Sequence, residues 1–228
     1  MEIVPGIHQV DGINGNVYII ARKGLVVIDT GIPGSGKKIL STIRDTLHRE
    51  PSEITTVVIT HFHTDHIGGV KALKDAAPGL KVAIHEADAG YVAGTIPLPR
   101  YPGLQGFAVG LFSWVMPTVF PPDILLKDGD RIEGLTVIHL PGHTPGSIGL
   151  LDEGSKTLFA GDLLRCPDGT TLTEGPGAFS MDLAASWESI RKIGSLEFDT
   201  LLIGHGTPVR PGAAAIVRAF AKTLPVRQ

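Results

Sequence analysis

The sequence predicts an α/β protein built from two similar halves, and two observations support this class. Apolar runs typical of strands alternate along the chain with segments typical of helices. Each half also has the same order of elements: a strand, a polar turn, a strand that ends in an aspartate, a helix, and a strand that ends in a histidine. Alternation of strands and helices is typical of the α/β class. We therefore expect two pseudo-equivalent halves that share one site.

The first half predicts four strands and two helices. The strands are expected at residues 16–20, 25–28, 56–60 and 81–84. The first helix carries Ile39, Ile43 and Leu47 at four-residue spacing, which places them on one face. The second helix is expected to begin near the histidine-rich segment 61–69 and to end before Pro78, because the residue before a proline rarely continues a helix.

The second half predicts the same plan. Its strands are expected at residues 137–140, 147–151, 157–160 and 200–203. A helix from about Leu183 to Ile193 has its apolar residues on one face, with Asp182 at its N-cap and Gly194 after its end. Aspartate and glycine are residues that these two positions prefer, so both ends of the helix are marked.

Length and composition favour a single domain over residues 1–228. Hydrophobic residues make up 43% of the chain and charged residues 19%, which is enough apolar material for a large core. The net charge of −3 gives no reason to expect a nucleic acid as partner. Cys166 is the one cysteine, so no intrachain disulfide can form, and the first residues lack the pattern of a secretory signal. We expect a cytoplasmic protein that acts on a small molecule.

An apolar insert at about residues 87–125 separates the halves. Residues 101–122 within it carry no charge, but four prolines and three glycines disfavour a membrane-spanning helix, so no membrane span is expected. The insert could roof the site as a lid, form a homodimer interface, or do both. Phe107 and Trp114 are candidate substrate contacts. The insert is expected to offer a large apolar surface, to which further side chains contribute: Leu111, Phe112, Val115, Met116 and Phe120.

Four predicted strands are followed closely by a residue that can bind a metal ion. These residues are His61, His143, Asp162 and His205. His63, Asp65 and His66 lie beside the first of them. Neutral imidazoles and carboxylates bind zinc and other first-row metals. A catalytic zinc site uses about three protein ligands and one open position, so five histidines and two aspartates suit two sites that share a carboxylate.

Together these residues form a set of motifs that resembles the metallo-β-lactamase superfamily. The motifs are His61-x-His63-x-Asp65-His66 followed by Gly68-Gly69, then Pro141-Gly142-His143-Thr144-Pro145-Gly146-Ser147, Gly161-Asp162, Gly204-His205-Gly206 and Asp29-Thr30-Gly31. The resemblance covers about residues 15 to 210 and points to the glyoxalase II and lactonase branch. It implies an α/β fold of the αββα four-layer sandwich type, with the metals at one edge between two sheets.

The resemblance also implies a role for each residue. The first metal ion would be held by His61, His63 and His143. The second would be held by Asp65, His66 and His205, and Asp162 would bridge the two ions. Zinc is the expected metal, with iron or manganese as alternatives.

We also predict roles for two residues outside the ligand set. Asp29 is expected to orient a ligand histidine, although an aspartate in a turn can also cap the loop that follows it. The true β-lactamases carry a cysteine where this chain has Asp162. Cys166 lies four residues later and is expected to be a small buried hydrophobe rather than a ligand.

The implied activity is hydrolysis of an ester, thioester or lactone-type acyl bond by a hydroxide held between the two metals. Asp65 is the candidate catalytic residue that passes a proton to the leaving atom. Three alternatives stay open. They are hydrolysis of a phosphoester or phosphotriester at the same site, a mononuclear iron oxidoreductase similar to persulfide dioxygenases, and a non-catalytic metal-binding protein.

Two features bear on the choice of substrate. Acyl-homoserine lactonases usually place a tyrosine where this chain has Arg165, so Arg165 is either a substrate contact or a residue of a surface ion pair. The segment after His205 is short and carries only scattered basic residues. A region that recognises glutathione is therefore not expected.

Overall fold

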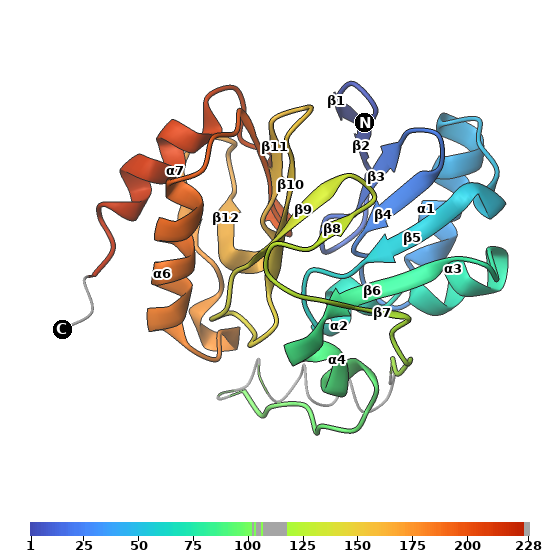
Figure 1. The fold of residues 1–228 in the computed structure, drawn as a ribbon, viewed down its shortest axis with the longest axis horizontal. Coiled ribbons are helices and arrows are strands. Elements are labelled where there is room, and N and C mark those ends of the chain that lie inside the picture. The colour runs from blue at the N-terminus through green and yellow to red at the C-terminus, as the bar shows by residue number, and fades with distance from the viewer. Residues whose placement is uncertain (102, 104–105, 107–117, 226–228) are drawn as a thin grey trace. The chain divides into compact units, whose positions relative to one another are not determined.

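The computed structural model describes residues 1–101, 103, 106 and 118–225. The chain divides into two compact units, Met1–Leu126 and Lys127–Gln228, which we call unit 1 and unit 2. Each unit has its own strands and its own helices (Figure 1). The described residues of the predicted insert at about residues 87–125 belong to unit 1. That residues 1–228 act as a single domain stays a prediction.

Unit 1 contains a seven-stranded sheet whose strands lie in the order of the sequence. The strands are β1 (Glu2–Val4), β2 (Ile7–Gln9), β3 (Tyr18–Ala21), β4 (Leu25–Ile28), β5 (Ile54–Val58), β6 (Lys81–His85) and β7 (Ile124–Leu126). The strands from β1 to β4 pair antiparallel, and those from β4 to β7 pair parallel. Because the last four strands run in the same direction, the segments that follow them leave from one edge of the sheet.

The helices of unit 1 are short. They are α1 (Gly36–Ser41), the π-helical turn η1 (Thr42–Thr46), the 3-10 turn η2 (Pro51–Glu53), α2 (Thr64–Ile67), α3 (Val70–Ala76) and α4 (Glu86–Val92). The predicted second helix is found as the two helices α2 and α3, separated at Gly68 and Gly69. The N–H groups of these two glycines donate to Gly31 O (2.8 Å) and Thr30 Oγ1 (3.0 Å). These two N–H groups therefore bind the loop after β4, whereas in a continuous helix they would donate to helix carbonyl groups.

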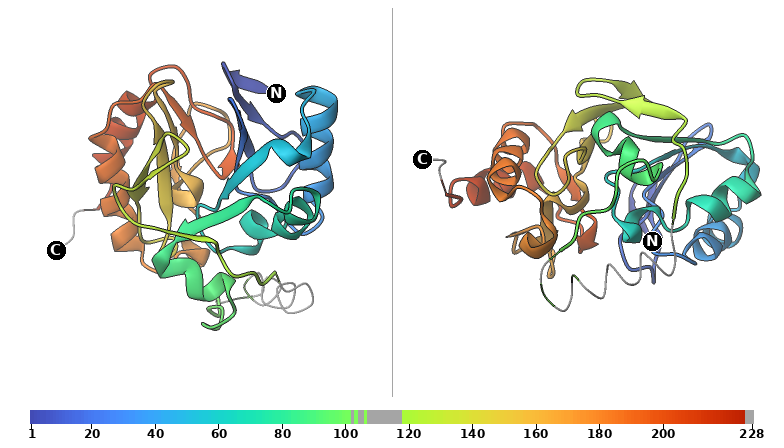
Figure 2. Two further views of the ribbon diagram at one scale, coloured as in Figure 1. Left: turned by 45° about the vertical axis from the view of Figure 1, so that its right-hand side comes forward. Right: turned by 90° about the horizontal axis from the view of Figure 1, so that it is seen from below.

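Apolar side chains from α1, η1 and α3 form a core with the sheet of unit 1. Ile39, Ile43 and Leu73 are fully buried in one cluster with Val27 of β4 and Val57 of β5. Figure 2 shows these helices beside the strands from two further directions. Burial of one such side chain contributes about 1.5–3 kcal/mol, so this cluster fixes the two strands from which the site loops start.

Unit 2 contains a five-stranded sheet in the order β14-β11-β10-β9-β8 and a three-stranded sheet in the order β13-β12-β15. The strands are β8 (Arg131–Ile132), β9 (Leu135–His139), β10 (Ile148–Asp152), β11 (Thr157–Phe159), β12 (Leu164–Cys166), β13 (Thr173–Glu174), β14 (Thr200–Leu202) and β15 (His205–Gly206). β10 pairs antiparallel with β9 and with β11, and β11 pairs parallel with β14. Hence β9, β11 and β14 point in the same direction.

Two helices of unit 2 cover its larger sheet (Figure 1). They are α6 (Leu183–Gly194) and α7 (Ala213–Ala221), and the unit also has the 3-10 turns η3 (Gly161–Leu163) and η4 (Gly177–Phe179). Ile190, Ile193 and Val217 are fully buried in one cluster with Leu158 and Leu201 of the sheet. The bounds of α6 agree with the predicted helix to within one residue.

The two units share the predicted order of elements. In unit 1, the antiparallel hairpin β3–β4 is followed by a helix and by β5, which is parallel to β4. In unit 2, the antiparallel hairpin β10–β11 is followed by α6 and by β14, which is parallel to β11. The prediction of two pseudo-equivalent halves is confirmed.

Part of the predicted apolar insert lies outside the described residues. This applies to Phe107, Leu111, Phe112, Trp114, Val115 and Met116. Phe120 is described, and its side chain is only 8% exposed because it packs into the core of unit 1. The expectation that Phe120 adds to an exposed apolar surface is therefore wrong. No helix within the described part of the chain has the length and apolar character needed to cross a membrane.

The first testable prediction concerns the start of α6. Asp182 Oδ1 accepts a hydrogen bond from Ala185 N at 2.9 Å. Asp182→Ala removes this cap and is expected to lower the free energy of unfolding by about 1 kcal/mol, measured by urea denaturation. Asp182→Asn keeps an acceptor at the cap and serves as the control. Equal stability of the alanine variant and the native chain would contradict the prediction.

Candidate metal centre

The candidate ligands of unit 1 follow β5 at the edge where its parallel strands end. β5 ends at Val58, and His61, His63, Asp65 and His66 lie on the loop and the short helix α2 just beyond it. His61 and His66 are buried, and the centroids of their rings are 4.1 Å apart. Buried ring nitrogens need polar partners, and the partners found here determine how each ring is oriented.

A buried carboxylate at the end of the neighbouring strand β4 orients two of these histidines. Asp29 accepts hydrogen bonds from the Thr60 backbone N–H (2.7 Å), the Thr60 hydroxyl (2.8 Å) and His66 Nδ1 (2.8 Å). Because the Thr60 hydroxyl donates to Asp29, its 3.0 Å contact with His61 Nδ1 has Nδ1–H as the donor. As neutral imidazoles, His61 and His66 therefore both carry the proton on Nδ1 and a lone pair on Nε2.

His63 faces His61 across a short gap. Its Nδ1 lies 3.1 Å from His61 Nε2. Two nitrogens bound to one tetrahedral zinc ion lie about 3.3 Å apart, given Zn–N distances of about 2.0–2.1 Å. The observed separation fits a shared metal ion.

The other ring nitrogen of His63 meets a tyrosine from the insert. His63 Nε2 lies 2.5 Å from the Tyr101 hydroxyl oxygen. Burial raises the pKa of the Tyr101 phenol well above its usual range, and Asp88, Tyr91 and Asp65 raise it further. Tyr101 therefore meets His63 as a neutral phenol at physiological pH.

Asp65 is partly exposed to water. Its Oδ2 lies 4.0 Å from His66 Nε2, and its side chain is 35% exposed whereas that of His66 is fully buried. A carboxylate in this position can reach both the ligand cluster and water.

Unit 2 brings together three further candidate ligands. β9, β11 and β14 run in one direction, and His143, Asp162 and His205 follow their carboxyl ends. His143 Nε2 lies 3.7 Å from Asp162 Oδ2, and His205 Nε2 lies 3.4 Å from the same oxygen. His143 Nδ1 lies 3.1 Å from Ser180 Oγ. One carboxylate oxygen thus has an imidazole nitrogen on either side.

The segment that carries His143 requires a glycine. Gly142 has φ of +133°, and a Cβ there would lie 2.2 Å from the backbone nitrogen of Ser186 at the start of α6. The backbone of Asp182 donates to Gly142 O at 2.8 Å, and that of Met181 donates to His143 O at 3.1 Å. Two successive carbonyl groups of the loop, those of Gly142 and His143, are thus hydrogen-bonded to the residues just before α6. The close approach is possible because residue 142 is a glycine.

Both donor sets fit divalent metal ions. In each unit, an imidazole nitrogen and its neighbouring carboxylate oxygen or second imidazole nitrogen lie within 4.0 Å of each other, as ligands of one ion do. For His61, His63, His66 and His143, one ring nitrogen is held by a residue behind the ring and the other faces further ligands. Such support is typical of metal-binding histidines.

The remaining predicted residues of unit 2 lie on β12. Arg165 is half-buried, and its backbone pairs with that of His205. No ion pair of Arg165 is found within the part of the chain that the structure describes. Cys166 is fully buried, as expected of a small hydrophobe. Phe107 and Trp114 lie outside the described residues.

Three residues that contact the histidines were missed from the sequence. Thr60 immediately precedes His61, so its position was a usable signal. Tyr101 and Ser180 lie 38 and 37 residues from the histidines they contact. No local pattern marks either of them.

The sequence profile of the metallo-beta-lactamase superfamily matches residues 10–205. The chain belongs to this superfamily of metal-dependent hydrolases. It is 30% identical over 233 residues to the probable metallo-hydrolase YflN of Bacillus subtilis (strain 168), covering 91% of this chain and 86% of the relative. It is also 33% identical over 157 residues to a hydroxyacylglutathione hydrolase of Cereibacter sphaeroides, covering 67% of this chain and 48% of that relative.

Solved structures confirm the predicted fold class. The di-iron-bound form of TTHA1623 matches with a TM-score of 0.67 and 26% identity, covering 91% of this chain and 96% of that one. The metallo-beta-lactamase family protein TTHA1429 of Thermus thermophilus matches with a TM-score of 0.70 and 20% identity, covering 97% and 80%. At 20% identity, the similarity to TTHA1429 shows the fold alone.

The second testable prediction concerns Cys166. Burial raises the pKa of this thiol, and the thiolate is the reactive form, so the native chain is expected to react with Ellman's reagent at least about 100-fold more slowly than the unfolded chain. Release of thionitrobenzoate measures the rate. The chain in guanidinium chloride is the positive control, and a rapid burst of one thiol in the native chain would contradict the prediction.

Proposed function

We propose that the chain hydrolyses an acyl bond, in an ester, a thioester or a lactone, at two divalent metal ions held by ligands from both units. One observation carries the proposal. Three histidines of unit 1 and His143 of unit 2 are each held through one ring nitrogen, while the other nitrogen faces further groups that can bind a metal. This arrangement supports metal binding with an open position for a substrate, rather than a role in packing alone.

The proposed distribution of ligands rests on the motifs. His61, His63 and His143 hold one ion. Asp65, His66 and His205 hold the other, and Asp162 is shared. The Nδ1 protons of His61 and His66 support this proposal, because they leave Nε2 as the ligand atom in both rings.

When bound, the two ions would supply a hydroxide at neutral pH and a positive centre for the oxygen that becomes negative during hydrolysis. Asp65 is the proposed proton carrier, since its carboxylate is both close to His66 and partly exposed to water. Asp29 and Thr60 keep the imidazoles in the tautomer that a metal needs. Arg165 beside His205, together with Phe107 and Trp114, stay candidate substrate contacts.

An acyl bond is favoured over a phosphoester by one of the relatives. The similar protein from Cereibacter sphaeroides is named for hydrolysis of an acylated glutathione, which is a thioester. This chain spans about half of that relative's length, so only the class of bond is carried over. Zinc is the proposed metal, and the di-iron form of a structural relative supports iron as the alternative. A cytoplasmic location and a homodimer through the insert stay predictions.

The third testable prediction is turnover of one class of acyl substrate. A proton-release assay on the metal-loaded chain is run against esters, thioesters, lactones, a β-lactam and phosphate di- and triesters. We expect turnover of an acyl class, loss of activity with a chelator and recovery with zinc or manganese. Turnover of phosphoesters alone would contradict the choice of bond. Oxygen uptake with a persulfide under iron loading would contradict hydrolysis.

Removal of a proposed ligand tests the centre itself in the same assay. His66→Ala and Asp162→Ala are each expected to lower kcat/KM more than about 100-fold, since even residues behind a ligand can change activity by 10–100-fold. Elemental analysis is expected to give two ions per native chain and fewer in both variants. His8→Ala changes a histidine on β2 that is not one of the candidate ligands, and it is the control. Full activity in either ligand variant would end the proposal of two metals.

The fourth testable prediction concerns Asp29. Asp29→Asn tolerates the φ of +59° but presents an amide that cannot accept from Thr60 and His66 as the carboxylate does. His66 is then expected to move its proton to Nε2, and zinc affinity should fall by about 10–100-fold. Competition with a chelator measures the affinity, and ¹⁵N shifts of the metal-free chain report the tautomer. Asp199→Asn, which keeps the acceptor for Gly212 N, is the matched control. An unchanged tautomer would contradict the prediction.

A further inference from the structure

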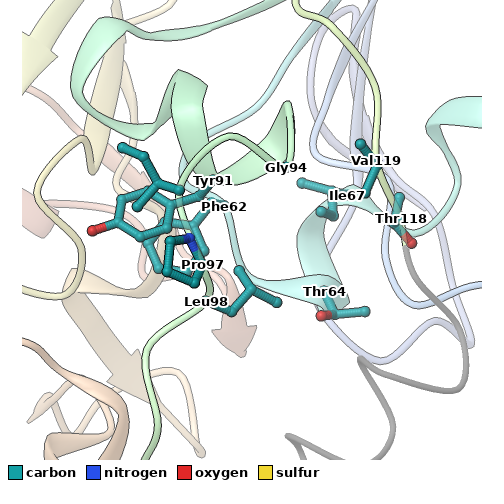
Figure 3. Close-up of a pocket in the computed structure, with 10 residues that line it drawn as sticks. Phe62, Thr64, Ile67, Tyr91, Gly94, Pro97, Leu98, Thr118 and Val119 are labelled. Carbon is teal, nitrogen blue, oxygen red and sulfur yellow. The ribbon is translucent and has the colours of Figure 1, made fainter.

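Unit 1 contains an apolar pocket of about 180 Å³ beside the candidate ligands. Figure 3 shows Phe62, Tyr91 and Pro97 on one side of it and Ile67, Thr118 and Val119 on the other. We call it the Phe62 pocket. Its described lining carries no charged side chain, and the side-chain hydroxyls are those of Thr64, Tyr91 and Thr118. A group that enters it is therefore expected to be uncharged, because a buried charge without a partner is strongly unfavourable.

The pocket and the candidate ligands share one segment of chain. Residues 61, 63, 65 and 66 supply the ligands, whereas Phe62, Thr64 and Ile67 line the pocket. The ring of Phe62 lies 4.9 Å from that of His63 and stacks on that of Tyr91 at 4.2 Å. Phe62 is thus a wall common to the pocket and to the surroundings of His63.

Hydrogen bonds to α4 hold the other walls in place. Thr95 N and Ile96 N both donate to Gly90 O, at 2.9 and 3.0 Å, and Phe120 N donates to Val92 O at 2.9 Å. Phe62 N also donates to the buried Asp88 Oδ2 at 3.1 Å. The pocket is therefore built into the fold before any ligand arrives, which lowers the ordering cost of binding.

The pocket also collects apolar side chains that water reaches. Ile96 is 42% exposed, Leu98 is 45% exposed and Val119 is 61% exposed, and all three line it. Apolar side chains gathered in one place on a surface usually mark a binding site. A volume of about 180 Å³ suits roughly six carbon atoms, because a cavity of about 150 Å³ holds one benzene molecule.

We infer that the Phe62 pocket binds an apolar chain of about six carbons that the substrate carries next to the bond that is hydrolysed. This inference rests on the proposed function and narrows it to substrates with a medium-length alkyl or acyl group. The chain lies against Phe62, so its polar end is directed toward His63 and the ligand cluster.

The first experiment needs no catalysis and no metal. The metal-free chain is titrated with 1-propanol, 1-butanol, 1-pentanol, 1-hexanol and 1-octanol, and amide shifts of Gly94, Leu98 and Thr118 are followed by NMR. Affinity is expected to rise about fourfold per methylene up to hexanol and to level off beyond it, because each buried methylene contributes a constant increment. Shifts that are absent, or that do not depend on chain length, would overturn the inference.

The second experiment measures hydrolysis of a matched series of acyl esters or thioesters. The ratio of kcat/KM for a hexanoyl substrate over an acetyl substrate is expected to exceed about tenfold in the native chain. Leu98→Trp fills the pocket and is expected to bring this ratio close to one and to abolish the hexanol shifts. Leu125→Trp makes the same change at an exposed leucine of β7 outside the pocket and is expected to leave the ratio unchanged.

The two experiments separate the pocket from the proposed function. If hexanol binds the native chain but not Leu98→Trp, and no acyl substrate is turned over, the apolar site stands and the proposed hydrolysis fails. If acyl substrates are turned over with equal kcat/KM at every chain length, the hydrolysis stands and the inference fails. Circular dichroism on both tryptophan variants confirms that the fold is intact.

Discussion

The carboxylate of Asp29 is the constraint on which the candidate centre of unit 1 depends. It joins β4 to the segment after β5 through Thr60, and it reaches α2 through His66. A carboxylate only accepts hydrogen bonds, so every group that it touches must donate. This one requirement determines the direction of the Thr60 hydroxyl, and through it the proton on His61 as well as the proton on His66. One acid thus determines the orientation of two imidazoles, the one that it accepts from and the one that contacts Thr60.

The fold supplies what this carboxylate needs. β4 and β5 pair in parallel, with Ile28 opposite Val58, so Asp29 leaves the sheet beside Thr60. The adjoining residue Thr30 fastens the segment that follows, since its N–H and its hydroxyl donate to His66 O at 2.7 and 2.9 Å. Gly68 lets this segment approach closely, because a Cβ there would lie 2.1 Å from the backbone nitrogen of Pro33. Strand pairing, loop and ligand orientation therefore depend on one another.

Much of this could be predicted from the sequence, because its signals are local. Apolar runs that end in His61 or Asp162 indicate both the strand and the residue presented at its end. The contacts of Tyr101 and Ser180 could not be predicted, since they join segments far apart in the chain. The separation of α2 from α3 could not be predicted either. It results from the N–H groups of Gly68 and Gly69, which donate to Gly31 O and Thr30 Oγ1 instead of to the helix. These acceptors are distant in sequence from the two glycines, although each belongs to a recognisable motif.

The repeat explains why aspartates at corresponding positions have different surroundings. Asp29 is the first residue after β4, whereas Asp162 is the third residue after β11, in the turn η3. His61 and His205 are likewise the third residues after β5 and β14. A residue directly after its strand stays next to the strand end, whereas the chain can turn before a residue that comes two positions later, as it does at η3.

Asp29 therefore lies behind the imidazoles of unit 1, where it accepts hydrogen bonds from His66 and Thr60. Asp162 instead lies directly beside the imidazoles of its own unit. Its Oδ2 comes within 3.4 Å of His205 Nε2 and within 3.7 Å of His143 Nε2. Two additional residues, Ala160 and Gly161, make this difference, and Gly161 adopts a φ of +52° within the turn. The same strand-and-helix plan thus places an acid behind the histidines in one unit and an acid directly beside the histidines in the other, according to the number of residues between the acid and its strand.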